Sequence, residues 1–146
     1  MNEHPLEHTV EQDLLCSLRM LLKRYALMRQ PVTLASGGAS SIYIDCRQVY
    51  FRGEAQFLLG ELFFKKMLEI EALHKPFLAC GGMAMGSIPL TIALTTAAFR
   101  RGRPLPGCAV RKERKQHGTQ SQIEGSSSLL KGSEVIVVED VVTTAS

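Results

Sequence analysis

Apolar residues recur at helical spacing in three stretches of the chain. The first stretch starts at Thr9 and Gln12, which read as a capping box, and it predicts a helix over 9–28. The second predicts a helix over 53–70. The third predicts a helix over 87–102, with proline in its first turn and glycine past its end. The apolar positions are Val10, Leu14, Leu18, Leu21, Leu22 and Tyr25 in the first stretch and Phe57, Leu58, Leu62 and Met67 in the second.

Short apolar runs between these stretches predict strands. In TLASGGASSIYIDCRQV, a glycine and serine turn precedes alternating Ile42, Ile44 and Cys46, a pattern typical of a half-buried strand. PFLACGG and GCAVRKE predict two further strands. In EVIVVED, the β-branched run over 135–138 is typical of a strand covered on both faces. RKQHGTQSQIEGSSS is predicted to be a polar loop. Because strands alternate with helices, we expect an α/β fold with a mainly parallel sheet flanked by helices.

Composition and charge narrow the class of protein without identifying it. The 146 residues suit a single domain, and 45% hydrophobic with 21% charged residues is ordinary for a globular protein. The net charge of +3 favours anionic ligands only weakly. The cysteines form no C-x-x-C pair, which argues against a zinc site, and with no signal peptide visible we expect reduced thiols and a cytoplasmic protein. No apolar run is long enough to predict a membrane span.

The first candidate chemistry lies at the end of the third strand. Glu139 and Asp140 follow it directly, and in open α/β sheets ligands bind beyond the carboxyl ends of strands. Thr143, Thr144 and Ser146 would then line a turn whose N–H groups and hydroxyls suit an anion such as phosphate. The carboxylates could accept hydrogen bonds from sugar hydroxyls or help to hold a metal ion. The same residues also fit an acidic pair that only ends the strand and caps the next element.

Two other segments have residue types that suit a charged ligand. The basic loop RKERKQHGTQSQIEG offers several cations, although a solvated surface turn or a nucleic-acid patch has the same appearance. The loop has no aromatic residue and the chain has no Trp, which argues against the nucleic-acid interpretation. In CGGMAMGSIP, the glycines at 81, 82 and 86 let backbone approach a charged group just before a helix N-terminus. Glycine turns after strands are also common without any ligand.

Together these segments resemble the type I phosphoribosyltransferases, and orotate phosphoribosyltransferase in particular. VVEDVVTT resembles the family's phosphoribosyl pyrophosphate (PRPP) signature, and RKERKQHGTQSQIEG resembles its mobile catalytic loop, over about 111–125. CGGMAMGSIPL is similar to the glycine-rich pyrophosphate loop, and LASGGASSIYIDCR is similar to the base-binding segment, over about 32–47. The four motifs stand in family order. The resemblance implies that orotate and PRPP are converted to orotidine 5'-phosphate and pyrophosphate in pyrimidine (UMP) biosynthesis.

The resemblance also implies a role for individual residues. The loop cations would bind pyrophosphate, with two of them catalytic, and a tyrosine would pack on the orotate ring, although Tyr43 fits a half-buried strand residue equally well. The acidic pair would bind the ribose hydroxyls and the turn after it the 5-phosphate. The residues are Arg111, Lys112, and the catalytic Lys115 and His117 in the loop; Gly81 and Gly82; Tyr43; Glu139 and Asp140; and Val141, Val142, Thr143, Thr144, Ala145 and Ser146.

The same resemblance implies cofactors and partners. We expect Mg²⁺ dependence, with no side-chain metal ligand assigned, and a homodimer in which loop residues act in the neighbouring subunit's site. Ala145 stands where the family usually has glycine, and its methyl group would weaken phosphate binding if that turn needs a positive φ or a backbone N–H close to the phosphate. In the family a helix, further strands and an orotate-binding arginine follow this turn, so we expect an N-terminal portion of the enzyme. A PRPP-binding regulator and an inactive remnant that pairs with full-length subunits are the alternatives.

Overall fold

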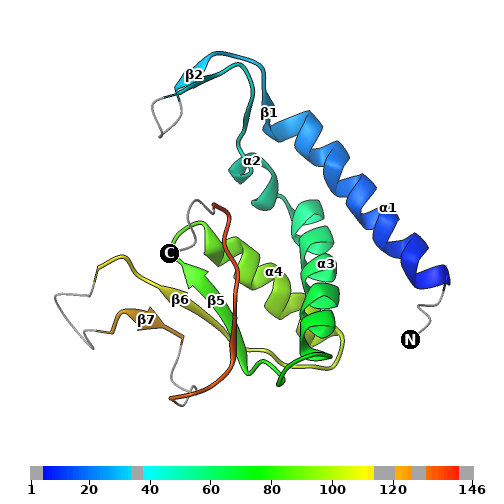
Figure 1. The fold of residues 1–146 in the computed structure, drawn as a ribbon, viewed down its shortest axis with the longest axis vertical. Helices are drawn as coiled ribbons and strands as arrows, with labels where there is room; N and C mark the ends of the chain where they lie inside the picture. Colours follow the sequence, from blue (N-terminus) through cyan, green and yellow to red (C-terminus); the bar gives the residue numbers. More distant parts are fainter. Residues whose placement is uncertain (1–4, 34–37, 114–120, 126–130, 142–146) are drawn as a thin grey trace. The chain divides into compact units, whose positions relative to one another are not determined.

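The computed structural model describes residues 5–33, 38–113, 121–125 and 131–141. The chain divides into two compact units, Met1–Leu58 and Leu59–Ser146, and each is described by itself. Figure 1 shows the elements of both. The prediction of a single domain stays a prediction.

The first unit combines a long helix with two small hairpin-like pairs of strands. β1 pairs with β4 and β2 with β3, both antiparallel. Its core is small: Ala26, Val49, Tyr50 and Ala55 are buried, together with the acidic Asp45. The elements are α1 (Pro5–Leu21), the π-helical turn η1 (Leu22–Ala26), β1 (Leu27–Met28), β2 (Val32–Thr33), β3 (Ala39–Ser40), β4 (Tyr43–Ile44), α2 (Arg47–Tyr50) and the first residues of α3 (Gly53–Glu71).

The first helix differs from its predicted bounds of 9–28 at both ends. It begins at Pro5, a residue whose fixed φ suits the first helical position, so Thr9 and Gln12 lie inside the helix and the predicted capping box is wrong. The helical chain ends at Ala26 instead of 28. Leu27 is extended there, with φ −76° and ψ 112°, because it pairs with Ile44 across the β1–β4 ladder. A pairing between segments distant in sequence therefore overrides the local helical pattern.

The half-buried strand predicted at 42–46 is also wrong in its burial. Only Tyr43–Ile44 forms a strand, and the side chains of Ile42 and Ile44 are 55% and 53% exposed. Cys46 is exposed as well and caps α2. Alternating apolar and polar residues predict a half-buried strand only where a second layer covers one face of the sheet. This two-residue strand pairs with the equally short β1, and such a small pair buries little.

Asp45 links the end of the first helical segment to α2. Its backbone N–H donates to the Ala26 carbonyl, and its Oδ1 accepts from the backbone N–H of Arg47 at 3.2 Å and from Arg47 Nε at 2.7 Å. Hydrogen bonding from the Arg47 side chain, against the opposing effect of burial, lowers the pKa of the Asp45 carboxyl below its usual value of 3.8.

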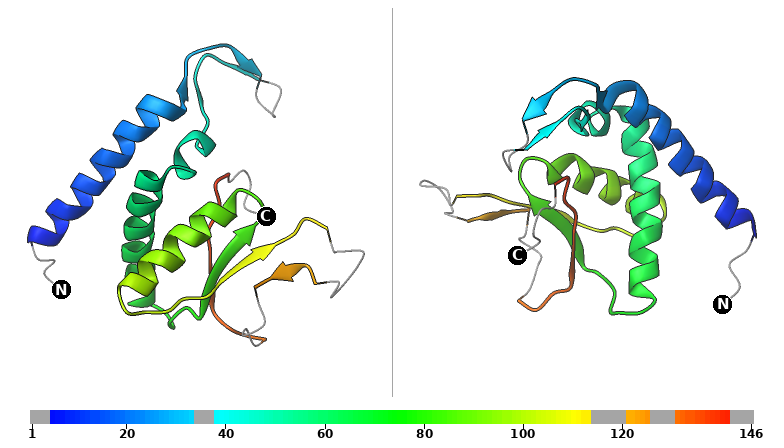
Figure 2. Two further views of the ribbon diagram at one scale, coloured as in Figure 1. Left: turned by 180° about the vertical axis from the view of Figure 1, so that it is seen from behind. Right: turned by 45° about the horizontal axis from the view of Figure 1, so that its top comes forward.

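The second unit is built on a mainly parallel sheet, as predicted. In the described ranges the strand order is β7-β6-β5-β8, with β5 parallel to both β6 and β8. Figure 2 shows β5 in green beside β6 in yellow. The helix predictions at 53–70 and 87–102 are confirmed within two residues. The elements are the remainder of α3, β5 (Ala79–Met83), α4 (Ser87–Arg100), β6 (Gly107–Val110), β7 (Ile123–Glu124) and β8 (Val135–Val137).

Two details of this sheet correct the sequence prediction. Ile123–Glu124, predicted as part of a polar loop, forms β7 and pairs antiparallel with β6. Val137 of β8 is 71% exposed, so the strand is not covered on both faces as its β-branched run suggested. β8 stands at an edge of the sheet formed by the described residues, where a strand has one neighbour instead of two.

Helix α4 packs closely on one face of the sheet. A Cβ at Gly107 would lie 2.8 Å from a methyl carbon of Thr91, and the buried Cys80 thiol lies 4.0 Å from the Thr91 carbonyl oxygen. Burial raises the pKa of Cys80 to about 12. On its other side α4 meets α3, where a Cβ at Gly60 would lie 2.5 Å from the Ala93 carbonyl oxygen. Such close approaches leave no room for larger residues.

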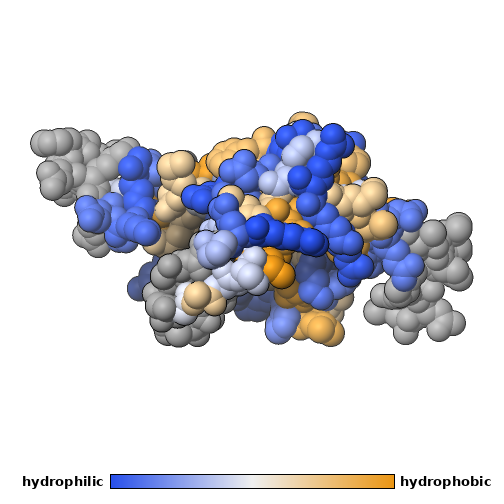
Figure 3. All heavy atoms as spheres, turned by 90° about the horizontal axis from the view of Figure 1, so that it is seen from above, coloured by the Kyte–Doolittle hydropathy of each residue, from blue (hydrophilic) through white to orange (hydrophobic). Residues whose placement is uncertain are grey.

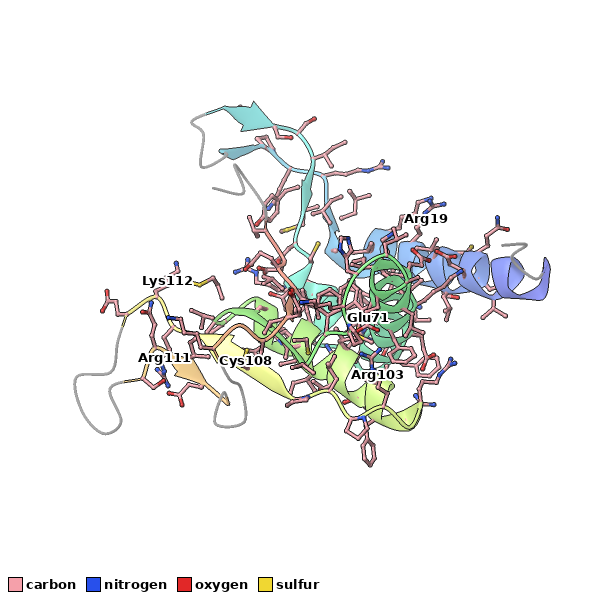
Figure 4. All side chains as sticks on the ribbon, turned by 60° about the horizontal axis from the view of Figure 1, so that its bottom comes forward. Arg19, Glu71, Arg103, Cys108, Arg111 and Lys112 are labelled. Atoms are coloured by element: carbon pink, nitrogen blue, oxygen red, sulfur yellow. The ribbon has the colours of Figure 1, made fainter. Side chains whose placement is uncertain are left out.

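The end of α4 connects the helices to the sheet. Gly102 has φ +74°, and the N–H groups of Gly102 and Arg103 donate to the carbonyls of Phe99 and Ala98, which is a Schellman motif. Arg103 then binds the Glu71 carboxylate through both terminal nitrogens. Figure 4 labels both residues. Hydrogen bonding from Arg103 lowers the pKa of Glu71 below its usual 4.5.

The surface mixes apolar and polar side chains. Leu73 is 82% exposed and Phe99 is 71% exposed, and the face drawn in Figure 3 shows hydrophobic residues among hydrophilic ones. In the part of the chain that the structure describes, every helix is too short or too polar to span a bilayer.

Candidate functional site

The carboxyl ends of three parallel strands meet at one edge of the sheet in the second unit. Met83 at the end of β5 is in register with Val110 at the end of β6, and Gly81 is in register with Val137 of β8. Chain segments that follow these strands therefore start side by side, about 10 Å apart from first to last strand. This edge brings together the glycine turn, the acidic pair and the start of the basic segment.

The glycine turn after β5 lies directly against the acidic pair. A Cβ at Gly82 would overlap the carbonyl oxygen of Val138, whose own N–H donates to the Gly81 carbonyl at 2.8 Å. A Cβ at Gly86 would overlap the Asp140 carboxylate. This close approach of Asp140 to the glycine turn is a feature of the second unit. The missing side chain at each of these two glycines is what allows it.

Asp140 lies close to the N-terminus of α4. Gly86 is the N-cap residue of that helix, so the carboxylate lies where the positive end of the helix dipole favours negative charge. The backbone N–H of Asp140 also donates to Glu139 Oε1 at 3.1 Å. A position that attracts a carboxylate is suited to other anions, including a diphosphate.

Ser87 is a residue of this site that the sequence analysis did not single out. It is fully buried at the first position of α4, and its hydroxyl donates to the Met83 carbonyl at 2.7 Å. The turn is further held by the Ala84 N–H, which donates to the Val110 carbonyl at 2.8 Å, and its Ala84–Met85 peptide bond is cis. Its place directly after the last glycine of the turn is the sequence feature that could have indicated Ser87 as a site residue. These bonds fix the turn from both ends.

Arg111 extends β6 at the same edge, and Lys112 follows it (Figure 4). The Arg111 N–H donates to the Gln122 carbonyl at 2.8 Å, and Arg111 Nε donates to Glu124 Oε1 at 2.9 Å. Both side chains of this ion pair are roughly half exposed. Glu124 is the second residue that sequence reasoning missed, because its strand was not predicted.

The other predicted residues belong to the first unit, follow Asp140 directly or lie outside the described residues. Tyr43 belongs to the first unit and is 36% exposed on β4, and Val141 is exposed after Asp140. Lys115 and His117 lie outside the described residues, and so do Val142, Thr143, Thr144, Ala145 and Ser146.

Comparison with known proteins identifies the family. No protein-family model matches the chain. The chain is 38% identical over 124 residues to orotate phosphoribosyltransferase from Sorangium cellulosum, covering 85% of this chain and 62% of the relative. It is 39% identical over 132 residues to the Aquifex aeolicus enzyme of that name, covering 88% and 68%. The chain belongs to the orotate phosphoribosyltransferase family.

A solved structure of the orotate phosphoribosyltransferase family agrees with this assignment. Mycobacterium tuberculosis H37Rv orotate phosphoribosyltransferase, solved in complex with 5-phospho-alpha-D-ribosyl 1-diphosphate (PRPP), is 33% identical. It superposes with a TM-score of 0.63 over 88% of this chain and 65% of that one. The chain thus spans about two thirds of the length of its relatives. The predicted family and the type I phosphoribosyltransferase fold class are confirmed.

Proposed function

We propose that the protein is an orotate phosphoribosyltransferase of pyrimidine (UMP) biosynthesis. In the proposed reaction a ring nitrogen of orotate, which gives up its proton, forms a bond to C1 of PRPP. The bond between C1 and the diphosphate oxygen breaks, and pyrophosphate leaves with the electron pair. The products are orotidine 5'-phosphate and pyrophosphate.

One observation carries this proposal. In a chain of this family, the glycine turn, the acidic pair and Arg111 converge on a single edge of the sheet. The reaction needs little covalent chemistry from the protein, so positioning and electrostatic stabilisation supply most of the rate acceleration. An edge that offers N–H groups, carboxylates and a cation side by side supplies both.

Each group has a part in the proposed mechanism. Glu139 and Asp140 accept hydrogen bonds from the ribose hydroxyls and hold C1 in place. Gly81 and Gly82 lie against Cys108 and Val138, and the turn that follows them receives the diphosphate. Arg111, Lys112, Lys115 and His117 stabilise the charge that grows on it as it leaves. The segment over 141–146 binds the 5-phosphate.

The proposal includes Mg²⁺. This ion favours carboxylate, phosphate and water oxygens, and commonly uses only one or two carboxylates beside substrate phosphates. Glu139 and Asp140 are adjacent carboxylates at the proposed PRPP site, and the described residues hold no cluster of three or more metal-ligating side chains. The donor set therefore fits an ion held mainly by the diphosphate. Bound there, Mg²⁺ would neutralise part of the leaving group's charge.

We propose a cytoplasmic homodimer in which loop residues of one subunit act in the site of the other. Orotate phosphoribosyltransferase relatives and four free thiols support an enzyme of small metabolites in a reducing compartment. Sedimentation of the purified chain with and without PRPP measures the oligomeric state.

The test separates catalysis from binding alone. Calorimetry with PRPP and Mg²⁺, followed by an orotate-depletion assay, gives three distinct outcomes. Binding with turnover supports the enzyme. Binding without turnover favours a PRPP-binding regulator or remnant over the enzyme, and absence of both refutes the proposal for this chain.

A single substitution tests the leaving-group role of the loop. Lys115→Ala should lower kcat by roughly two to three orders of magnitude, because a cation that contacts the departing diphosphate stabilises the transition state more than the substrate. Lys75→Ala removes an equal charge outside the site and should leave kcat unchanged. Equal rates for both variants and the parent would contradict the assignment.

A further inference from the structure

Glu124 has no part in the mechanism above, yet it binds Arg111, which follows the strand next to the glycine turn. It lies on β7, in register with Ala109 of β6, whereas Arg111 lies two residues further along the neighbouring chain. The two side chains are diagonal neighbours across an antiparallel pair, a separation that long side chains bridge. Their contact is the 2.9 Å bond from Arg111 Nε to Glu124 Oε1.

The backbone around Arg111 is held by the same short strand. The Arg111 N–H donates to the Gln122 carbonyl at 2.8 Å, and the Gln122 side-chain amide donates back to the Arg111 carbonyl at 3.0 Å. Gly125, with φ +82°, follows the strand, and a Cβ at this position would lie 2.6 Å from the Gly107 carbonyl oxygen, so only glycine fits there. Arg111 is thus fixed at its backbone by Gln122 and along its side chain by Glu124.

The bond to Glu124 uses only one of the donors of the guanidinium. Arginine carries five N–H donors in a rigid planar fork, which suits two-point binding of phosphate oxygens. Across the described part of the chain, the terminal nitrogens of Arg111 make no hydrogen bond. An acceptor at Nε therefore orients the fork while both terminal amino groups stay available.

We propose that Glu124 is a positioning residue that aligns Arg111 for the diphosphate of PRPP. The inference rests on the proposed function. A half-exposed ion pair contributes little to stability, so a purely structural role is a weak explanation for it. Alignment has a larger effect on PRPP binding. An arginine that is not already held loses its rotamer freedom when the ligand binds, and that loss weakens binding.

The competing hypothesis is that Glu124 weakens PRPP binding instead of supporting it. Glu124 carries a negative charge close to the proposed diphosphate site, and charge repulsion alone would weaken PRPP binding. Removing the carboxylate then tightens binding, whereas under the positioning role it weakens binding. The sign of the change in affinity decides between the two.

The experiment compares Glu124→Gln with Glu124→Ala. Glutamine keeps an oxygen that accepts the Nε–H but loses the charge, so its Kd for PRPP, measured by calorimetry with Mg²⁺, should stay within about threefold of the parent. Alanine loses the acceptor and should raise the Kd and KM for PRPP about tenfold, with a smaller change in kcat. Arg111→Ala combined with Glu124→Ala should bind no more weakly than Arg111→Ala alone.

A matched control removes an equivalent charge elsewhere. Glu69→Gln disrupts the exposed pair with Lys66 on α3 and should leave the Kd unchanged. Should the alanine variant fail to fold, Glu124→Met, of similar length and without an acceptor oxygen, takes its place. Unchanged or tighter binding by Glu124→Ala or Glu124→Met, in a parent chain that binds PRPP, overturns the positioning role alone. A parent chain that binds no PRPP overturns the proposed function, and this inference with it.

Discussion

Gly82 and Gly86 lie four residues apart and meet different kinds of neighbour. The missing side chain of Gly82 makes room for the Val138 backbone and for Cβ of Ser87, which are fixed parts of the sheet and of α4. The missing side chain of Gly86 makes room for the Asp140 carboxylate, the end of a side chain that can rotate away. A methyl group at each position therefore has a different effect.

Gly82→Ala should destabilise the fold, whereas Gly86→Ala should mainly weaken ligand binding. The first forces backbone apart and should lower the free energy of unfolding by about 3 kcal/mol. The second displaces Asp140 from its place beside α4, and because Gly86 has helical φ and ψ, it should cost less than about 1 kcal/mol of stability. Its Kd for PRPP should rise about tenfold. Thermal unfolding and calorimetry measure both, and the reverse ranking would contradict the site.

Helices α3 and α4 are in contact through small residues. Gly60 of α3 faces the Ala93 carbonyl and the Ala97 side chain, at 2.5 Å and 3.1 Å from the position of a Cβ. Gly53, at the start of the same helix, would have nothing within 4 Å of a Cβ. One helix thus contains a glycine that its packing requires and another that its packing does not.

Gly60→Ala should lower the free energy of unfolding by about 1–3 kcal/mol even though alanine favours helix. The added methyl group must push α4 away from α3. Gly53→Ala meets no neighbour and should change stability by less than about 1 kcal/mol, in either direction. Chemical denaturation of both variants measures the difference, and equal effects would show that the helix contact is looser than described.

The helices and central strands were predictable because each carries a sufficiently long pattern of its own. The bounds of α3 and α4 were predicted from apolar residues at helical spacing. The strands β5 and β8 were predicted from apolar runs that are followed by glycines or by acidic residues. β7 has only two residues, and it exists because β6 offers a partner, which no local pattern records. For the same reason Glu124 was not predicted although Arg111 was, whereas Ser87 could have been predicted from its place directly after Gly86.

At the scale of the whole molecule, both units contain carboxylates with a lowered pKa. Asp45 is bound by Arg47 in the first unit and Glu71 by Arg103 in the second. A carboxyl whose folded pKa lies below its unfolded value stabilises the protein above the unfolded value. That contribution is lost as the pH falls through the lower folded pKa. Both units should therefore lose stability in acid.

Glu71→Gln should reduce stability most at neutral pH. Above about pH 4.5, the usual pKa of the group, the variant should be less stable than the parent by roughly 2 kcal/mol, because Arg103 loses a charged partner. The difference should shrink as the pH falls below that value. Denaturation followed by circular dichroism measures it, with the exposed Glu69→Gln as the control expected to show little change. A difference that grows in acid would contradict the direction of the shift.

Cys80 lies between the central strand and α4 with its sulfur held as a thiol, while Cys16 and Cys46 are exposed. Alkylating reagents attack the thiolate, so in the native protein they modify the two outer cysteines well before this one. Modification of Cys80 then requires the strand and the helix to separate. The rate at which an alkylating reagent modifies Cys80, followed by mass spectrometry, therefore reports how often the core of the second unit opens.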